Sequence, residues 1–347
     1  MKTLRLGKLK CAFRRLASSR IRGATILLYH RVAQVRPDPW GLCVSPENFA
    51  EHLEVLQRTG RPILHLTDLE RKLRNGPLPR GAIVITFDDG YADNLYNAQP
   101  LLARYKTPAT FFIATGCIDR HREFWWDELD RILLQPGNLP PKLSLILNQR
   151  RYEWNLRDDS AYSENDSRKH CTWTTGNEAP TRRHSLYREL WEHLANIDES
   201  EKDEIIDRLA RWGNLPRTSR PSHASLTSDE LQTLANNKHI EIGAHSVNHP
   251  MLASLTPLQQ SKEIEDSKIF LEKLLNRPVR SFSYPHGNLS NETVSLVRDA
   301  HFNCACSTVA DIVRKGSDPF QLPRIEVKNW GGGKFKRQLS LGRLPLV

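Results

Sequence analysis

Three polar segments in this 347-residue chain each follow a short apolar run of the kind that forms a buried strand. They are Asp88-Asp89-Gly90, His245-Ser-Val-Asn-His249 and Tyr284-Pro285-His286-Gly287. Two adjacent carboxylates are costly to desolvate unless a positive charge compensates them. The aspartate pair at the end of a strand therefore predicts a nearby cation.

The two histidines of the second segment, four positions apart, have the spacing of metal ligands. A loop or helical turn can place both imidazoles on one side, and a carboxylate from another strand then completes a three-ligand set with an open position for water. His/His/Asp suits zinc or another divalent transition metal. Such an ion would stabilise one aspartate of the pair as the anion, while the other acts as a base. The plainer alternatives are surface or core histidines and an Asp-Asp-Gly turn.

Strand-like and helix-like segments alternate along most of the chain. The predicted strands are 25–29, 63–66, 82–87, 109–114, 240–243, 279–284, 302–307 and 322–327. Helix starts are predicted at Ser45-Pro46 and at three capping boxes, Thr67–Glu70, Thr227–Glu230 and Thr256–Gln259. The alternation predicts an α/β architecture with a parallel sheet, either open and doubly wound or closed or partly closed into a barrel. In both forms chemistry gathers at the carboxyl ends of the strands.

The stretch 119–222 interrupts this alternation. It is polar, contains six of the eight tryptophans and has a helical stretch around 186–212. We therefore expect an inserted, mainly helical subdomain at 119–222. The rest of the chain would divide into a basic amphipathic segment at 1–22, the α/β domain at 23–118 and 223–327, and a basic tail at 328–347.

The net charge of +10 lies at the two ends of the chain. Residues 1–22 carry eight Lys/Arg and residues 328–347 carry five, with no acids in either, so the remaining chain is at −3. That distribution argues against a nucleic-acid partner, which would need a basic surface on the folded domain. Apolar residues recur at helical spacing within 1–22 and predict either peripheral contact with an anionic membrane or a helix packed on the domain.

Cysteine usage and the first residues bear on the cellular compartment. Six cysteines without a CxxC pair or a dense framework fit a reducing compartment. The first twenty residues have no apolar core of signal-peptide length, and no run approaches the roughly 18 apolar residues of a membrane span. We therefore expect a cytoplasmic protein whose membrane contact, if any, is peripheral and at the inner face.

The three polar segments resemble, in order and context, the motifs of the polysaccharide deacetylases, the NodB-homology family of carbohydrate esterases that includes chitin and peptidoglycan deacetylases. The residues that carry the resemblance are Thr86-Phe-Asp-Asp-Gly90, His245-Ser-Val-Asn-His249 and Phe282-Ser-Tyr-Pro-His-Gly287. The resemblance covers roughly residues 24–118 and 223–327. The segments "LLYHRV" and "FWWDEL" also look like those of bacterial members associated with exopolysaccharide or surface-glycan synthesis.

The resemblance implies an irregular (β/α) barrel of about seven strands. It implies that Asp89, His245 and His249 hold a divalent metal, with zinc as the first candidate, and that Asp88 is the general base. A water activated by the metal would attack the acetamide carbonyl of an N-acetylated sugar, and the backbone N–H of His286 would stabilise the oxyanion. Free amine and acetate would leave.

The sequence departs from the family pattern at two positions. Ser283 stands where many members have the arginine that orients the catalytic aspartate. Arg324 stands where many have the histidine of a Leu-x-His motif that supplies the general acid, and an arginine does not readily donate a proton. We therefore expect Arg324 to orient the base, to stabilise charge or to form a structural ion pair, and His30 or His286 to protonate the leaving amine. The alternative for His30 is a buried, hydrogen-bonded histidine.

Substrate contacts are predicted at Tyr284 and Pro285, and at Trp126 as a weaker candidate, because aromatic faces match the apolar faces of pyranose rings. The function expected is that of a metal-dependent hydrolase that removes N-acetyl groups from a sugar unit of a bacterial glycan, or of its lipid- or nucleotide-linked precursor. The alternatives are a catalytically silent glycan-binding protein on the same fold and a hydrolase of another non-peptide C–N amide bond.

Overall fold

The computed structural model describes residues 23–216 and 218–341. The chain divides into two compact units. Of the described residues, one unit, here called the barrel unit, comprises 23–34, Cys43–Ile118 and 226–341. The other, the inserted unit, comprises Val35–Leu42, 119–216 and 218–225. The inserted unit thus also includes residues 35–42, which no sequence pattern separates from the α/β domain. The predicted basic segment 1–22 and the last six residues of the predicted tail lie outside the described residues.

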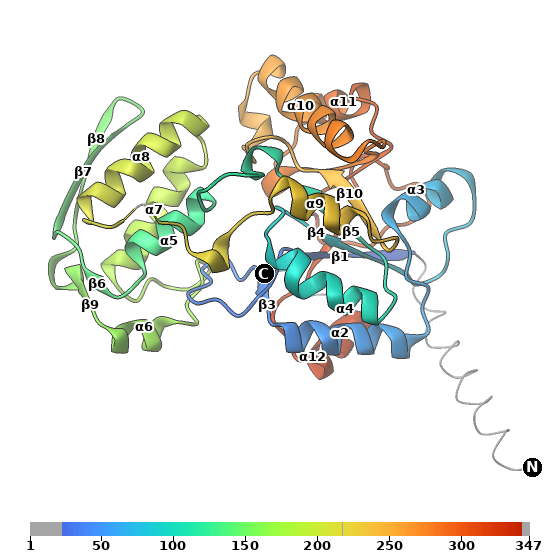
Figure 1. Ribbon diagram of the computed structural model, residues 1–347, viewed down its shortest axis with the longest axis horizontal. Helices are drawn as coiled ribbons and strands as arrows, with labels where there is room; N and C mark the ends of the chain where they lie inside the picture. The colour runs from blue at the N-terminus through green and yellow to red at the C-terminus, as the bar shows by residue number, and fades with distance from the viewer. Residues whose placement is uncertain (1–22, 217, 342–347) are drawn as a thin grey trace, which may run out of the picture. The chain divides into compact units, whose positions relative to one another are not determined.

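A seven-stranded parallel sheet forms the centre of the barrel unit (Figure 1). Its strand order is β12-β11-β10-β5-β4-β1-β13. The strands are Ala24–Tyr29 (β1), Ala82–Phe87 (β4), Ala109–Ile113 (β5), Ile240–Ala244 (β10), Ser281–Ser283 (β11), Cys304–Cys306 (β12) and Ile325–Glu326 (β13). Two further short strands, Arg31–Val32 (β2) and Cys43–Val44 (β3), pair with each other. The sheet curls into a half-barrel, so the prediction of an α/β barrel-like fold of about seven strands is confirmed.

The central strands are apolar on both faces, as expected for a parallel sheet that is covered on both sides. Every residue of β1, β4 and β5 is buried. β4 pairs with β1 along its whole length, from Ala82 opposite Ala24 to Phe87 opposite Tyr29. Because the strands run in parallel and in step, the residues that follow them emerge at one edge of the sheet. The predicted strand 63–66 is reduced to a single bridge at Ile63, because a helix begins at 66.

Helices connect the strands of the barrel unit (Figure 1). They are Pro46–Thr59 (α2), Leu66–Asn75 (α3), Gln99–Arg104 (α4), Ser228–Ala235 (α9), Pro257–Leu275 (α10) and Asn291–Asp299 (α11). A further helix, Gly332–Leu341 (α12), follows the last strand. Ser45, Thr227 and Thr256 cap α2, α9 and α10 as predicted. The predicted capping box at Thr67 is wrong. Thr67 is the second residue of α3, and its hydroxyl donates to the carboxylate of Glu241 on β10.

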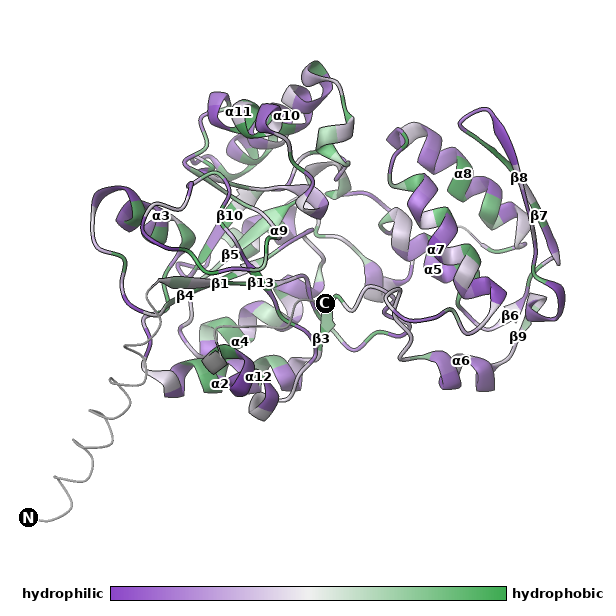
Figure 2. Cartoon of the chain, turned by 180° about the vertical axis from the view of Figure 1, so that it is seen from behind, coloured by the Kyte–Doolittle hydropathy of each residue, from purple (hydrophilic) through white to green (hydrophobic). Residues whose placement is uncertain are grey.

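The inserted unit is mainly helical. Its helices are Trp125–Leu133 (α5), Glu164–His170 (α6), Arg182–Leu194 (α7) and Glu199–Trp212 (α8). Gly137–Asn138 (β6) pairs with Ala161–Tyr162 (β9), and Lys142–Leu147 (β7) with Arg150–Asn155 (β8). Figure 2 shows β8 as a hydrophilic strand, whereas buried and exposed residues alternate along its partner β7. Among the described residues, no helix has the length and apolar character needed to cross a membrane.

Candidate active site

Two adjacent aspartates end β4, and the backbone turns sharply between them. The N–H of Asp88 donates to the carbonyl of Tyr29 at 3.0 Å, which continues the ladder with β1. Asp89 leaves the ladder with a φ of 77°, in the left-handed region that aspartate tolerates better than most residues, and Gly90 follows at 92°. Both carboxylates are buried, at 3% exposure. The turn gives each aspartate its own partners although they are neighbours in sequence.

The loop after β10 carries His245 and His249. Ser246 and His249 have φ values of 62° and 55°. The Ser246 hydroxyl accepts the N–H of His249 at 3.0 Å, and the Ser246 carbonyl accepts the N–H of Thr115 at 3.1 Å. Left-handed residues other than glycine persist where surrounding contacts hold them, and they are common at functional sites. This loop conformation brings both imidazoles to Asp89.

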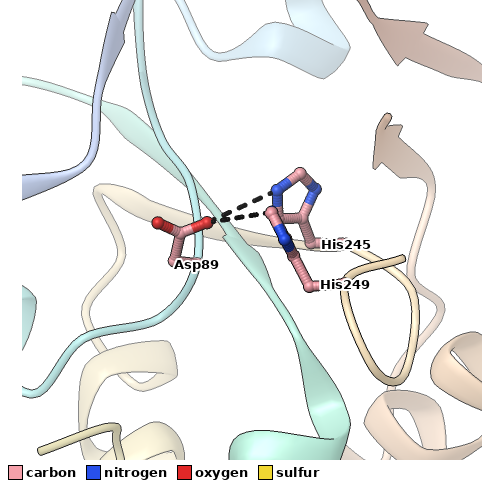
Figure 3. A group of neighbouring side chains, drawn as sticks. All are labelled: Asp89, His245 and His249. Carbon is pink, nitrogen blue, oxygen red and sulfur yellow. Dashed lines mark ion pairs between the residues drawn. The ribbon is translucent and has the colours of Figure 1, made fainter. Parts of the chain in front are cut away.

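Asp89, His245 and His249 form a compact, buried trio (Figure 3). Asp89 Oδ1 lies 3.3 Å from His249 Nε2 and 3.6 Å from His245 Nε2. His245 Nδ1 lies 2.7 Å from the carbonyl oxygen of Ser283, which can only accept, so Nδ1 carries a proton and Nε2 is the ring nitrogen that can bind a metal. Two imidazole nitrogens and one carboxylate oxygen match the ligand set of a three-residue zinc site.

The charge states of the trio also suit a cation. Burial alone would raise the pKa of Asp89, but the imidazoles of His245 and His249 hold it well below its usual range. Burial lowers the pKa of His249. Near pH 7 Asp89 is therefore ionised and His249 neutral, which are the protonation states that metal ligation requires. The residues present thus fit a divalent ion such as zinc.

Asp88 is bound by a buried arginine, Arg324, that lies far from it in the sequence. Arg324 Nη1 donates to Asp88 Oδ1 and Nη2 donates to Oδ2, both at 2.7 Å. Ser283 Oγ donates to Asp88 Oδ2 at 3.0 Å and accepts from Arg324 Nη2 at 2.8 Å. Burial raises the pKa of Asp88, but the Arg324 guanidinium outweighs it and the pKa is lowered. The two positions at which the sequence departs from the family pattern therefore contact each other and bind the same carboxylate.

Both candidate acids lie at this end of the sheet. The ring centroid of His286 is 4.3 Å from that of His249, in an edge-on arrangement. His30 follows β1, and its charge is among the causes that lower the pKa values of Asp88 and Asp89. His286 and His30 are half-buried, whereas the histidines of the trio are fully buried. The half-buried pair therefore has access to solvent, from which a spent acid can be reprotonated.

Tyr284 does not face this site. Side chains alternate along a strand, so Tyr284 points away from the face on which Ser283 contacts Asp88. Tyr284 is fully buried, packs on Phe282 and donates its hydroxyl to the carbonyl of Phe320 at 2.9 Å. The prediction that its ring stacks on a sugar is therefore wrong.

The two other predicted substrate contacts are also buried. Pro285 is buried at the start of a short turn, so its ring presents no contact surface. Trp126 is 5% exposed and stacks on Phe124 within the inserted unit. The structure therefore supports neither as a direct sugar contact.

A second group of ligand-type residues lies within the inserted unit. Asp127, Asp130 and His223 are buried, and their ligand atoms lie within 4.8 Å of one another. Arg220 donates to Asp130 Oδ1 and to the backbone carbonyl of Asp127, both at 2.8 Å, and its guanidinium also binds Glu123. A guanidinium thus already supplies positive charge to this cluster, and we assign it a structural role.

Glu263 of α10 contacts the histidine loop, and sequence reasoning missed it. It accepts the backbone N–H groups of Val247 and Asn248 at 2.9 and 2.8 Å. A glutamate on a long polar helix is typical of a solvated face, so no sequence signal separates Glu263 from its neighbour Glu265.

Comparison with known proteins bears on this site. The family model for polysaccharide deacetylase matches residues 75–138 and 212–305, which include both aspartates and the histidine loop but not Arg324. YxkH of Bacillus subtilis (strain 168), whose name places it among the polysaccharide deacetylases, is 26% identical over 102 residues, which span 29% of this chain and 36% of YxkH.

Solved structures with a similar fold cover nearly the whole chain. The Streptococcus pyogenes deacetylase PplD has a TM-score of 0.58 at 18% identity, over 91% of this chain and 98% of PplD. IcaB from Ammonifex degensii has a TM-score of 0.57 at 16% identity, over 92% of this chain and 97% of IcaB. At these identities the likeness establishes the fold.

Proposed function

We propose, since this chain contains a polysaccharide deacetylase domain, that it removes N-acetyl groups from a sugar unit of a bacterial glycan or of a glycan precursor. The family assigns the chain to the hydrolases that act on carbon–nitrogen bonds other than peptide bonds. One observation carries the proposal: of two adjacent buried aspartates, Asp88 is bound by Arg324 and Asp89 faces His245 and His249.

Asp89, His245 and His249 would hold a divalent metal, with zinc as the first candidate. When bound, the ion would act as a Lewis acid that lowers the pKa of water and polarises a carbonyl. The hydrogen bond from His245 Nδ1 to the Ser283 carbonyl supports this role, because it fixes the ring with Nε2 toward Asp89.

Asp88 is proposed to take the proton of the attacking water. The Arg324 fork fixes the plane of its carboxylate, and the lowered pKa keeps Asp88 in the basic form. Asp88 Oδ2 lies 3.8 Å from His245 Nε2, so the base is adjacent to the proposed ligands. A general base must lie within hydrogen-bond reach of the proton it removes, and this adjacency supports Asp88 in that role.

His286 or His30 is proposed to protonate the leaving amine, because the nitrogen must gain a proton when the acetamide C–N bond breaks. His286 lies against His249, and its backbone N–H is the proposed oxyanion donor. Arg324 is unsuited to be the acid, since a guanidinium keeps its proton and both of its terminal nitrogens bind Asp88.

The proposed substrate is an N-acetylated carbohydrate, in the form of an exopolysaccharide unit or a lipid- or nucleotide-linked precursor. The basic ends at 1–22 and 328–347 support a phosphate-bearing precursor at the inner face of the membrane, because clustered Lys/Arg are attracted to phosphates and anionic lipids. The solved structure of PplD is a complex with acetate, which is one product of the reaction proposed for this chain.

Acetate release by the purified chain tests the function. We expect release from N-acetylated sugar substrates, loss of release after chelation, and recovery on adding zinc. Lipid-linked and free N-acetyl sugars, compared at equal concentration, identify the substrate class. Acetate release that a chelator does not reduce would overturn the metal mechanism, and no release from any N-acetylated sugar would overturn the function.

A further inference from the structure

The loop between the two proposed histidine ligands is held from outside by one carboxylate. Glu263 Oε2 accepts the N–H groups of Val247 and Asn248 at 2.9 and 2.8 Å, and Oε1 accepts from the Asn248 side chain at 2.7 Å. Two consecutive backbone N–H groups that converge on one oxygen form an anion-binding nest. Here the anion is supplied by the chain itself, from helix α10.

The opposite side of the loop is fixed by a close backbone contact. The N–H of Gly116 donates to the carbonyl of Val247 at 2.8 Å. A Cβ at Gly116 would lie 2.8 Å from Asn248 Oδ1 and 2.9 Å from the Val247 carbonyl oxygen, so only glycine fits there. The loop is therefore clamped between residue 116 and Glu263.

The loop needs such support because of its backbone conformation. Ser246 and His249, at either end of the clamped dipeptide, both have positive φ, which costs about 1 kcal/mol or more at each residue. Without partners for the two N–H groups, the loop would relax toward ordinary φ values. The separation of the two imidazoles would then change.

We propose that Glu263 is a positioning residue that sets the spacing of His245 and His249 for a divalent ion. It does so through the backbone between them, at Val247 and Asn248. The inference rests on the proposed function, because it concerns the metal ligands of that same site. Mutation of an outer-shell residue whose hydrogen bonds orient the metal ligands typically lowers metal affinity by about 10–100-fold.

Helix α10 contains a matched control. Glu272 is, like Glu263, half-buried and accepts a backbone N–H from a loop, that of Val279 at 2.9 Å. Val279 precedes β11 and belongs to no proposed ligand segment. Glu272→Ala thus removes a helix-to-loop hydrogen bond from the same helix, one where Glu263 accepts three, and leaves the histidine loop unchanged.

The test is zinc affinity, measured by competition with a chromophoric chelator in wild type, Glu263→Ala, Glu263→Gln and Glu272→Ala. We expect zinc to bind Glu263→Ala about 10–100-fold more weakly than wild type, and Glu272→Ala within about twofold. Glu263→Gln keeps an acceptor oxygen but loses the charge, and we expect a loss of about fivefold. Both Ala variants should lower the melting temperature of the metal-free protein. At the same zinc concentration, only Glu263→Ala should gain less further stabilisation than wild type.

Two results would overturn the inference. The first leaves the proposed function intact, and the second contradicts its metal mechanism as well. If wild type binds zinc and both Glu263 variants bind it as tightly as Glu272→Ala, Glu263 has no positioning role and the proposed function is unaffected. If wild type binds no zinc, the metal mechanism fails as well. Should Glu263→Ala not fold, the comparison of Glu263→Gln with Glu272→Gln decides.

Discussion

Two buried clusters in this chain contain the same kinds of side chain, two aspartates with histidine, and they differ in where arginine lies. In the inserted unit Arg220 binds Asp130, one of the carboxylates of the ligand-type group itself. In the barrel unit Arg324 binds Asp88 and leaves Asp89 facing two imidazoles. The clusters thus compensate their buried negative charge in different ways.

The difference shows that burial and ligand-type residues do not by themselves define a metal centre. A guanidinium and a metal ion are alternative ways to stabilise a buried carboxylate. In the barrel unit the guanidinium goes to the neighbouring aspartate, so a cation at Asp89 still has a carboxylate to bind. The adjacent aspartates can then differ in role, one as proposed base and one as proposed ligand.

Asp88→Asn is expected to have the largest effect on the reaction. Asparagine keeps the shape of Asp88 but cannot take a proton, so kcat should fall by about 10²–10⁴-fold. Zinc binding should persist because Asp89 and the two histidines are unchanged. Steady-state acetate release and a zinc titration on the same preparation check both points, with exposed Asp299→Asn on α11 as control. Equal rates in wild type and Asp88→Asn would contradict the base, and no release by either would favour the glycan-binding alternative.

His286→Gln and His30→Gln, singly and together, sharpen the assignment of the acid. An acid must be protonated to act, so the rate falls as pH rises through its pKa. Loss of that acid should reduce kcat by about 10²-fold or more and remove this basic limb from the pH–rate profile. Exposed His301→Gln serves as control. A double variant with wild-type rate and an unchanged basic limb would show that neither histidine is the acid.

Arg324→Met should move the acidic limb of the same profile. Asp88 must be ionised to act, and Arg324 lowers its pKa, so removing the guanidinium raises that pKa and shifts the limb to higher pH. The variant also leaves a buried carboxylate uncompensated, at a cost of about 3–5 kcal/mol in the free energy of unfolding.

The matched control for Arg324→Met is Arg298→Met, which breaks a two-point pair with Asp318 at the surface. An exposed pair contributes about 1 kcal/mol or less, so this variant should change neither stability nor the profile appreciably. An unshifted acidic limb in Arg324→Met would mean that Arg324 does not tune Asp88.

The fold and the edge of the sheet that carries the site were predictable from sequence. Alternating strands and helices with polar segments at strand ends place Asp88, Asp89 and the histidine loop at one edge, because parallel strands share the direction in which they end. Alternation along the predicted strand 279–284 also contained the outcome for Tyr284, since neighbouring residues of a strand, here Ser283 and Tyr284, face opposite sides. Ser281 and Ser283 share one face of that segment and Phe282 and Tyr284 share the other, so the sequence already favoured the aromatic face as the one that packs in the core.

Other features depended on tertiary contacts that no local pattern records. The ion pair between Asp88 and Arg324 joins residues 236 positions apart, and the sequence suggested only that Arg324 orients the base, stabilises charge or is structural. The predicted capping box at Thr67 does not form, because the Thr67 hydroxyl donates a hydrogen bond to Glu241 on a strand distant in sequence. Glu263 looked like a solvated helix residue, and only the approach of the histidine loop gives it partners.

Zinc stoichiometry in wild type, His249→Ala and His223→Ala tests the central claim most directly. We expect Asp89, His245 and His249 to bind the ion, because Arg220 already supplies the positive charge in the cluster of the inserted unit. Wild type and His223→Ala should then bind one equivalent of zinc, and His249→Ala should bind none. One equivalent in His249→Ala, together with its loss in His223→Ala, would place the ion in the other cluster and contradict the claim.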